Sequence, residues 1–339
     1  MTRGLECRYT PAMIPLSILD VTAVPEGSTT AQALENARDL ARHAERLGYH
    51  RLWVAEHHNM QSIASAATSI VIAHLANATT SIRLGSGGIM LPNHAPLIIA
   101  EQFGTLATLF PGRIDLGLGR APGTDQVTAR ALRRNLSGSV DDFPNDVLEL
   151  QHYLKPAQPG QAVVATPGAG TEVPLWILGS SLYGAGLAAM LGLPFAFASH
   201  FAPAHMEQAI DIYREQFQPS AQLDKPYVML GYNVFAADTD EEAQLLQTSM
   251  MQTFVRLWRG TPGKMPPPQA GYWDTLGPQE QQMLGAMLRC SAVGDPDTVA
   301  TAMHAFVAST GADELMLMSS IHDHQKRLRS FELAAAAVG

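Results

Sequence analysis

Apolar runs of strand length alternate with helical patterns along almost the whole chain. Eight runs are interpreted as strands, over residues 13–21, 51–55, 82–90, 113–119, 175–179, 195–199, 227–236 and 314–319. Helical patterns separate them, as in residues 34–47, where apolar side chains recur on one face before Gly48. Repeated strand–helix units favour a parallel sheet, and eight such units fit a closed (β/α)8 barrel. An open doubly wound sheet is the alternative.

Glycine and polar clusters follow the predicted strands, as expected of a barrel, whose chemistry lies at the carboxyl ends of its strands. The clusters are Glu56-His57-His58, Gly85 to Gly88, Gly117 to Gly123, Gly179-Ser180-Ser181 and Ser199-His200. We therefore expect an α/β protein with a (β/α)8 TIM barrel, as one domain over residues 1–339 with a loose tail at 1–11. Two Pro- and Gly-rich segments, 137–172 and 260–278, are predicted insertions that cover the C-terminal face.

The charge balance disfavours several classes of function. The chain has 22 Lys+Arg and 31 Asp+Glu, a net charge of −9, and no dense basic run, so nucleic-acid binding is not expected. No uninterrupted apolar stretch of about 18 residues predicts a membrane span. Charged residues are only 16% and apolar residues 46%, which favours a large core and a subunit interface.

Cysteine usage and the N-terminal sequence indicate the compartment. Cys7 and Cys290 are too few and too far apart to predict a disulfide framework or a metal site. The first thirty residues contain no basic-then-apolar signal segment. A cytoplasmic protein is expected.

Glu56-His57-His58 admits three interpretations: half of a metal site, a general acid/base pair, or a structural pair at a strand end. Further metal ligands would have to come from His94, His200 or Asp20, whose spacing matches no known metal pattern. No metal site is therefore predicted, and acid/base chemistry or substrate contact is favoured.

Two glycine-containing turns are suited to an anion. Gly117 to Gly123 resembles a dinucleotide fingerprint but has Pro122 where the third glycine is needed, so Arg120 as a bidentate phosphate partner is favoured over that motif. A structural salt bridge of Arg120 is the alternative. Gly179-Ser180-Ser181 precedes a helix and is interpreted either as a second phosphate turn or as an ordinary N-cap. Glycines at 85, 87 and 88 indicate close approach of a flat ligand, or a β-bulge. Together these features suggest a phosphorylated planar cofactor across the barrel mouth.

At these residues the sequence resembles the bacterial luciferase-like flavin monooxygenases. The matching stretches are residues 52–58, 83–92, 100–102, 112–120 and 293–296, and a subgroup carries Gly-Arg-Ala-Pro-Gly-Thr-Asp, here Gly119 to Asp125. The resemblance implies a TIM-type barrel that binds FMN without a covalent bond and carries out oxygen chemistry.

The resemblance also implies roles for particular residues. Gly87-Gly88 matches a cis peptide beneath the flavin ring, Arg120 the phosphate-binding arginine, and Ser180-Ser181 the second phosphate turn. His57 matches an acid/base histidine beside the flavin, with Glu56 expected to orient it. Gly119 replaces a reactive cysteine of bacterial luciferase, so light emission is not implied.

The predicted function is a monooxygenase that uses reduced FMN and O2 on a small organic substrate through a peroxyflavin. A separate flavin reductase would supply the reduced FMN, and a homodimer is expected. Candidate substrate contacts are His58, Met90, His200 and Phe201, with Trp273 as a further possible wall. Two alternatives stay open: a deazaflavin-dependent hydride-transfer oxidoreductase, and a flavin-binding protein without turnover.

Overall fold

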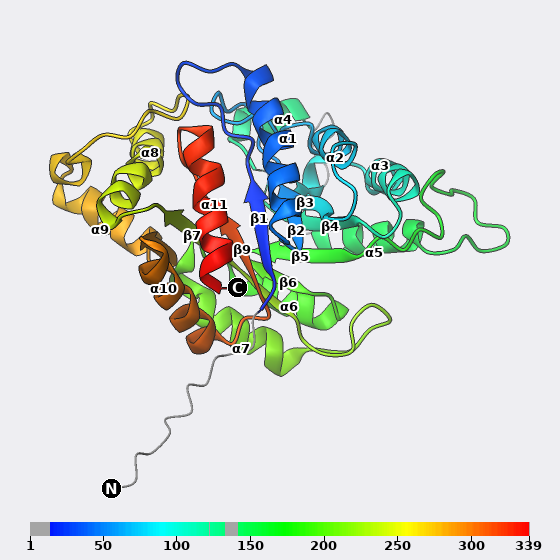
Figure 1. Cartoon of the computed structure of the whole chain (residues 1–339). Coiled ribbons are helices and arrows are strands. Elements are labelled where there is room, and N and C mark those ends of the chain that lie inside the picture. Colours follow the sequence, from blue (N-terminus) through cyan, green and yellow to red (C-terminus); the bar gives the residue numbers. More distant parts are fainter. Residues whose placement is uncertain (1–13, 122, 133–141, 339) are drawn as a thin grey trace, which may run out of the picture.

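The computed structural model describes residues 14–121, 123–132 and 142–338. Eight parallel strands in this part of the chain close into a barrel in the order β1-β2-β3-β4-β5-β6-β7-β9, with β9 paired back to β1 (Figure 1). The barrel strands are β1 (Leu16–Asp20), β2 (Arg51–Val54), β3 (Arg83–Met90), β4 (Ile114–Gly119), β5 (Leu175–Gly179), β6 (Phe195–Phe197), β7 (Val228–Ala236) and β9 (Glu314–Met318). The predicted closed barrel is confirmed, and the open doubly wound alternative is wrong. Cys7 and the tail at 1–11 lie outside the described residues.

Helices surround the barrel on its outer side (Figure 1). They are α1 (Thr30–Arg46), α2 (Thr68–Ala76), α3 (Pro96–Leu109), α4 (Gln126–Leu132), α5 (Phe143–Leu154), α6 (Leu182–Leu191), α7 (Met206–Gln216), α8 (Asp240–Trp258), α9 (Pro278–Met287), α10 (Pro296–Thr310) and α11 (His324–Val338). The 3-10 turns are η1 (Leu91–Asn93), η3 (Pro203–His205) and η4 (Tyr272–Thr275). None of the helices in the described ranges is long and apolar enough to cross a membrane.

Local capping chemistry explains where two helices begin. The Thr29 hydroxyl accepts a hydrogen bond from the Gln32 N–H at 3.1 Å, and α1 follows. Asp295 accepts from the Thr298 N–H at 2.8 Å, and Pro296 is the first residue of α10. Each helix therefore begins where a side chain satisfies a free backbone N–H.

A ninth strand in the described residues, β8 (Ser291–Gly294), was not predicted from the sequence. It pairs with β7 over Asn233 to Ala236, whereas β6 pairs with β7 only over Val228 to Leu230. Asn233 also pairs with Met318 of β9, so β8 lies on the edge of β7 that β6 has left. Four residues, Ser-Ala-Val-Gly, are too short to show a strand period, and the pairing partner makes this strand.

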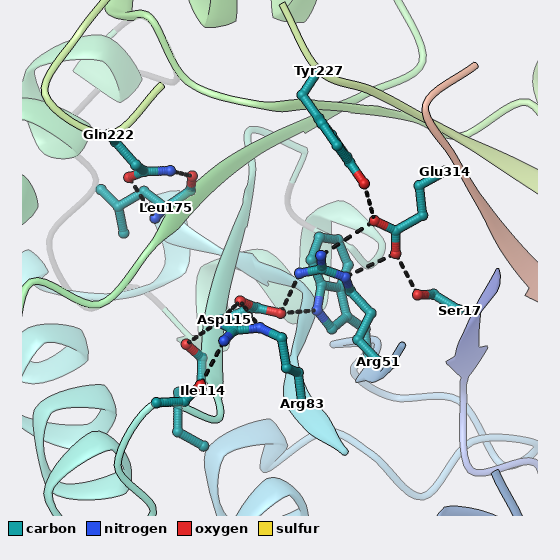
Figure 2. A network of polar contacts seen from close by, with 11 residues as sticks. Ser17, Arg51, Arg83, Ile114, Asp115, Leu175, Gln222, Tyr227 and Glu314 are labelled. Carbon is teal, nitrogen blue, oxygen red and sulfur yellow. Dashed lines mark hydrogen bonds and ion pairs between the residues drawn. The ribbon is translucent and has the colours of Figure 1, made fainter. Parts of the chain in front are cut away.

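The amino end of the barrel interior holds a buried polar network (Figure 2). The guanidinium of Arg51 donates to Asp115 Oδ2 at 2.6 Å and to Glu314 Oε1 and Oε2 at 2.8 and 3.2 Å. Asp115 also accepts from Arg83 Nε at 3.1 Å and from the Trp53 indole at 3.2 Å. These contacts satisfy charges that would otherwise be costly in the interior.

Two hydroxyl groups complete the network at Glu314. Ser17 Oγ donates to this carboxylate, and the Tyr227 hydroxyl donates to it at 2.9 Å. Burial alone would lower the pKa of the Arg51 guanidinium, but Asp115 and Glu314 outweigh it and raise that pKa. Arg51 therefore stays charged.

Aromatic side chains separate this network from the other end of the barrel. The rings of Trp53 and Trp176 meet edge to face with centroids 5.1 Å apart, and the Arg51 guanidinium lies 4.8 Å from the Trp176 ring centroid. Both indoles belong to an interior apolar cluster that also contains Leu19, Ala55, Ala196, Met229 and Met316. These residues follow the network residues along their strands, so the apolar cluster lies towards the carboxyl ends of the barrel.

The described parts of the two predicted insertions lie in different places. Helix α5 packs against α3, and a Cβ at Gly104 of α3 would overlap the backbone at Gly168, so part of 142–172 lies against the outer side of α3. The 260–278 segment lies beside the loop after β1, where the Glu26 N–H donates to the Met265 carbonyl at 2.7 Å. Residues 137–141 of the first segment lie outside the described residues.

Replacing Asp115 tests the stabilising role of the network. Asp115→Asn removes the charge shared by Arg51 and Arg83, leaving buried positive charge in excess. We expect unfolding free energy, measured by urea titration with circular dichroism, to fall by about 3 kcal/mol. Asp211→Asn, an exposed replacement on α7, is the matched control. Equal stabilities for the two variants would contradict this role.

Candidate functional site

The Gly87-Gly88 segment of β3 forms a side-chain-free part of the barrel wall. The peptide bond between these glycines is cis, as the resemblance implied. A Cβ at Gly87 would lie 2.7 Å from Leu19 Cδ1, and one at Gly88 would lie 2.7 Å from the Gly117 carbonyl oxygen. The register with β4 also shifts between Ser86 and Ile89, so the predicted β-bulge is present. A side chain at Gly88 would meet backbone, and one at Gly87 would require the Leu19 side chain to move.

Glu56 is buried and collects hydrogen bonds from two loops. Its carboxylate accepts from His58 Nε2 at 2.8 Å, from His94 Nε2 at 2.9 Å and from the Met90 N–H at 3.0 Å. Burial would raise the pKa of this carboxyl, but the hydrogen bonds and charge of His94, His58 and Met90 outweigh it and lower that pKa. The expectation that Glu56 orients His57 is corrected: its hydrogen bonds go to His58 and His94, because its side chain points away from the interior.

His57 continues the inward alternation of β2, after Arg51, Trp53 and Ala55. Its imidazole is half-buried, and its Nδ1 is a buried atom with no hydrogen-bond partner in the described part of the chain. Burial lowers the pKa of His57, although a hydrogen bond with the Gly123 backbone and the charge of Glu56 act in the opposite direction. A neutral imidazole with one unpartnered nitrogen is suited to accept a proton or to donate a hydrogen bond.

Arg120 and the start of α6 form the second part of the site. The Arg120 guanidinium lies 4.1 Å from the Tyr183 ring centroid, which places its charge over the first turn of α6. Ser181 is the N-cap, yet its side chain makes no capping hydrogen bond, and Ser180 and Ser181 are exposed. Gly179 and Gly184 pack closely, since a Cβ at Gly184 would lie 3.4 Å from Gly179 Cα.

This arrangement is suited to an anion. The N–H groups of a helix start favour negative charge, and an arginine adds a bidentate donor. No acidic side chain of the described residues forms an ion pair with Arg120, so the salt-bridge alternative has no support in this part of the chain.

The other predicted substrate contacts occupy different environments. Met90 is half-buried, and its sulfur fills the space that a side chain at Gly119 would need. His58 is held by Glu56. His200 is buried, whereas Phe201 and Trp273 are 46% and 38% exposed. Trp273 lies on η4, and no contact among the described residues joins it to His57.

Asn233 and Gly231 on β7 were missed by the sequence analysis. Asn233 is buried, and its Nδ2 donates to the His200 carbonyl at 2.6 Å and to Ser291 Oγ at 3.3 Å. A Cβ at Gly231 would overlap the His200 imidazole. An amide and a glycine at alternate positions of an otherwise apolar strand were the available signal, because alternate positions share one face.

Several buried polar atoms around the mouth have no partner in the described residues. They are His57 Nδ1, His200 Nδ1 and Asn233 Oδ1. Buried polar groups are nearly always hydrogen-bonded, so unpartnered ones beside a glycine wall fit a binding site. No group of three His, Cys, Asp or Glu side chains within the described ranges is arranged to hold a metal ion.

Comparisons with known proteins agree with this geometry. A family model described as luciferase-like monooxygenase matches residues 14–314. A luciferase-like monooxygenase of Escherichia coli (strain K12) is 54% identical over 325 residues, covering 96% of this chain and 97% of the relative. The solved structure of apo-MsnO8 is 38% identical, with a TM-score of 0.89, covering 96% of this chain and 98% of that chain.

More distant solved structures share the fold. The oxygenating constituent of 3,6-diketocamphane monooxygenase from Pseudomonas putida, in complex with FMN, is 19% identical with a TM-score of 0.71, covering 95% of this chain and 97% of that chain. Structures with this fold also include F420-dependent enzymes. The fold thus accommodates both flavins and deazaflavins.

The pH dependence of stability tests the burial of His200. Burial, with a smaller contribution from His57, lowers the pKa of His200 from 6.5 to about 4. The unfolded chain therefore binds this proton first, and the stability from neutral His200 is complete above pH 6.5 and lost as pH falls towards 4. Between pH 7 and 4.5 we expect the unfolding free energy, measured by urea titration, to fall by about 2 kcal/mol more for the wild type than for His200→Gln. His205→Gln, at an exposed position, serves as control; parallel losses in wild type and His200→Gln would refute the burial of a neutral imidazole.

Proposed function

Because the chain belongs to the luciferase-like monooxygenase family, we propose that it is a monooxygenase that uses reduced FMN and O2 on a small organic substrate. The observation that carries the cofactor assignment is the meeting of Arg120 with the uncapped start of α6. A phosphate is the group that such a turn binds best.

The residues present fit FMN. Arg120, Gly179, Ser180 and Ser181 would hold its phosphate, and the Gly87-Gly88 wall would lie under its ring, where any side chain would obstruct it. Bound reduced FMN would supply the electrons that activate O2. The glycine wall and the apolar interior below it keep water from the ring.

His57 is the proposed acid/base residue. Its Nδ1 has no partner, and its lowered pKa keeps the imidazole neutral near pH 7, so this nitrogen can take a proton from the substrate and return it. Glu56 acts indirectly, by positioning: its hydrogen bonds link the loop that carries His57 and His58 to His94, after β3.

The remaining partners come from the family resemblance. We propose a separate flavin reductase as the source of reduced FMN, a cytoplasmic location and a homodimer. Exposed apolar side chains on adjacent helices, Ile70 of α2 (70% exposed) and Ile98 and Leu109 of α3 (47% and 63%), support a subunit interface. A molar mass of a single chain in light scattering would contradict the proposed homodimer.

Arg120→Ala tests the phosphate assignment. We expect the Kd for FMN, measured by flavin fluorescence quenching, to rise roughly 10- to 100-fold, because one charge-assisted contact is lost. Riboflavin, which lacks the phosphate, should bind wild type and variant alike, and Arg38→Ala on α1 is the charge-matched control. If the protein bound a deazaflavin tightly and FMN negligibly, the deazaflavin would be the cofactor. The proposed reaction would then be hydride transfer and not monooxygenation.

His57→Ala tests turnover itself. The variant should bind FMN as the wild type does, while O2 consumption coupled to substrate, with a flavin reductase present, falls roughly 100-fold or more. The assay screens small organic substrates with an oxygen electrode and product analysis. Unchanged coupled O2 consumption would exclude the acid/base role. A wild-type protein that binds FMN but never consumes O2 with any substrate would favour the flavin-binding alternative without turnover.

A further inference from the structure

The wall above the two tryptophans is free of charge. Val21, Ala55, Leu178 and Met318 belong to the interior apolar cluster, and Gly87, Gly119 and Gly231 would project side chains onto Leu19, Met90 and His200. The charged interior side chains lie at the other end, where Arg51 and Arg83 balance the charges of Asp115 and Glu314 (Figure 2). Glu56 points out of the interior into its own hydrogen bonds.

His200 is seated in this uncharged wall by two residues of β7. Its imidazole lies directly on Gly231, where any Cβ would overlap it. Two residues further on, Asn233 Nδ2 holds the His200 carbonyl at 2.6 Å and thereby fixes the backbone where β6 leaves the sheet. The Phe201 ring packs edge to face against the imidazole, with centroids 4.9 Å apart.

The cluster of His200, Gly231 and Asn233 contains buried polar atoms that lack a hydrogen-bond partner among the described residues. Asn233 is 1% exposed and His200 is 9% exposed, and Asn233 Oδ1 has no hydrogen-bond partner among the described residues. His200 Nδ1 has none either, but it is the ring atom nearest Gly231, so the side of the ring with Nε2 is the side that would meet a substrate group. His57 is the titratable group whose charge acts on His200, and it lowers the pKa of His200 in the same direction as burial does. An amide and a neutral imidazole exchange hydrogen bonds with uncharged groups.

We propose that His200 and Asn233 recognise an uncharged polar group of the substrate, and that the part of the substrate within the barrel mouth carries no net charge. Gly231 is a positioning residue for the His200 ring, and Asn233 Nδ2 also holds the His200 backbone. The proposal rests on the proposed function for the existence of a substrate at this mouth. An anion or a cation here would lose its hydration without gaining an opposite charge, which is unfavourable, whereas an amide, alcohol or ketone carries no charge to desolvate.

The test uses three probes of nearly equal shape: benzamide (neutral), benzoate (anionic) and benzamidine (cationic). The full-length protein is labelled with 15N-histidine, and the imidazole signal of His200 is assigned by its loss in His200→Gln. Titrations are run with and without saturating FMN. We expect benzamide to shift the His200 signal with a Kd at least ten-fold lower than either charged probe, and to do so in both states.

Variants of the residues around His200 test the charge preference further. Gly231→Ala, which displaces the ring, should weaken benzamide binding about ten-fold, while His205→Gln should leave it unchanged. Asn233→Asp places a carboxylate in the mouth and should reverse the preference towards benzamidine. Circular dichroism checks that each variant is folded.

Three results would overturn the proposal: benzoate or benzamidine binding to wild type as tightly as benzamide, no probe moving the His200 signal, or FMN alone shifting that signal and abolishing the benzamide effect. The last result would assign His200 to the cofactor. The readout is probe binding, so failure of the proposed function can be recognised separately. In that case FMN binding or O2 consumption would be absent, while the preference for the uncharged probe would remain.

Discussion

The buried charge of Arg51 is the constraint on which the barrel interior depends. A guanidinium inside a closed sheet is tolerable only when carboxylates meet it, and Asp115 and Glu314 do so from strands far apart in the sequence. The Tyr227 and Ser17 hydroxyls and the Trp53 indole satisfy the remaining acceptors. Four strands are thereby joined at their amino ends by contacts that only this closure and register allow.

The layer above follows from that network. Trp53 donates to Asp115 and stacks against Trp176, and its bulk requires glycine at neighbouring positions: a Cβ at Gly85 would lie 2.8 Å from the indole nitrogen. The same exclusion operates at Gly87, beside Leu19 and Trp53. The glycine wall of the mouth is thus partly a packing consequence of the tryptophan layer, as well as a surface for a flat ligand. With these charges confined to the amino end of the interior, the wall above the tryptophans is apolar, with a few unpartnered polar atoms, and Arg120 lies beside it at the start of α6.

Much of the fold was predictable because local chemistry and period agree. Each of the eight predicted strand runs contains one barrel strand, and the apolar face predicted over residues 34–47 lies in α1 and its C-cap. The missed strand, β8, has no signal of its own, since its pairing depends on the edge of β7 that β6 leaves free. Glu56 was paired with the wrong histidine for a related reason: adjacent residues of an extended segment point in opposite directions, so its partners come from its own loop and from the loop after β3.

The sequence by itself determined the alternating architecture, the helix starts, the glycine-rich strand ends and the place of Arg120 and His57 at those ends, because period, capping and backbone freedom are local properties. Only the tertiary structure decided that Asn233 and Gly231 seat His200, that Met90 occupies the space above Gly119, and that the charged residues are neutralised away from the mouth. These facts depend on barrel closure and strand register, which bring together residues far apart in the sequence, such as Ser17 and Glu314, 297 positions apart.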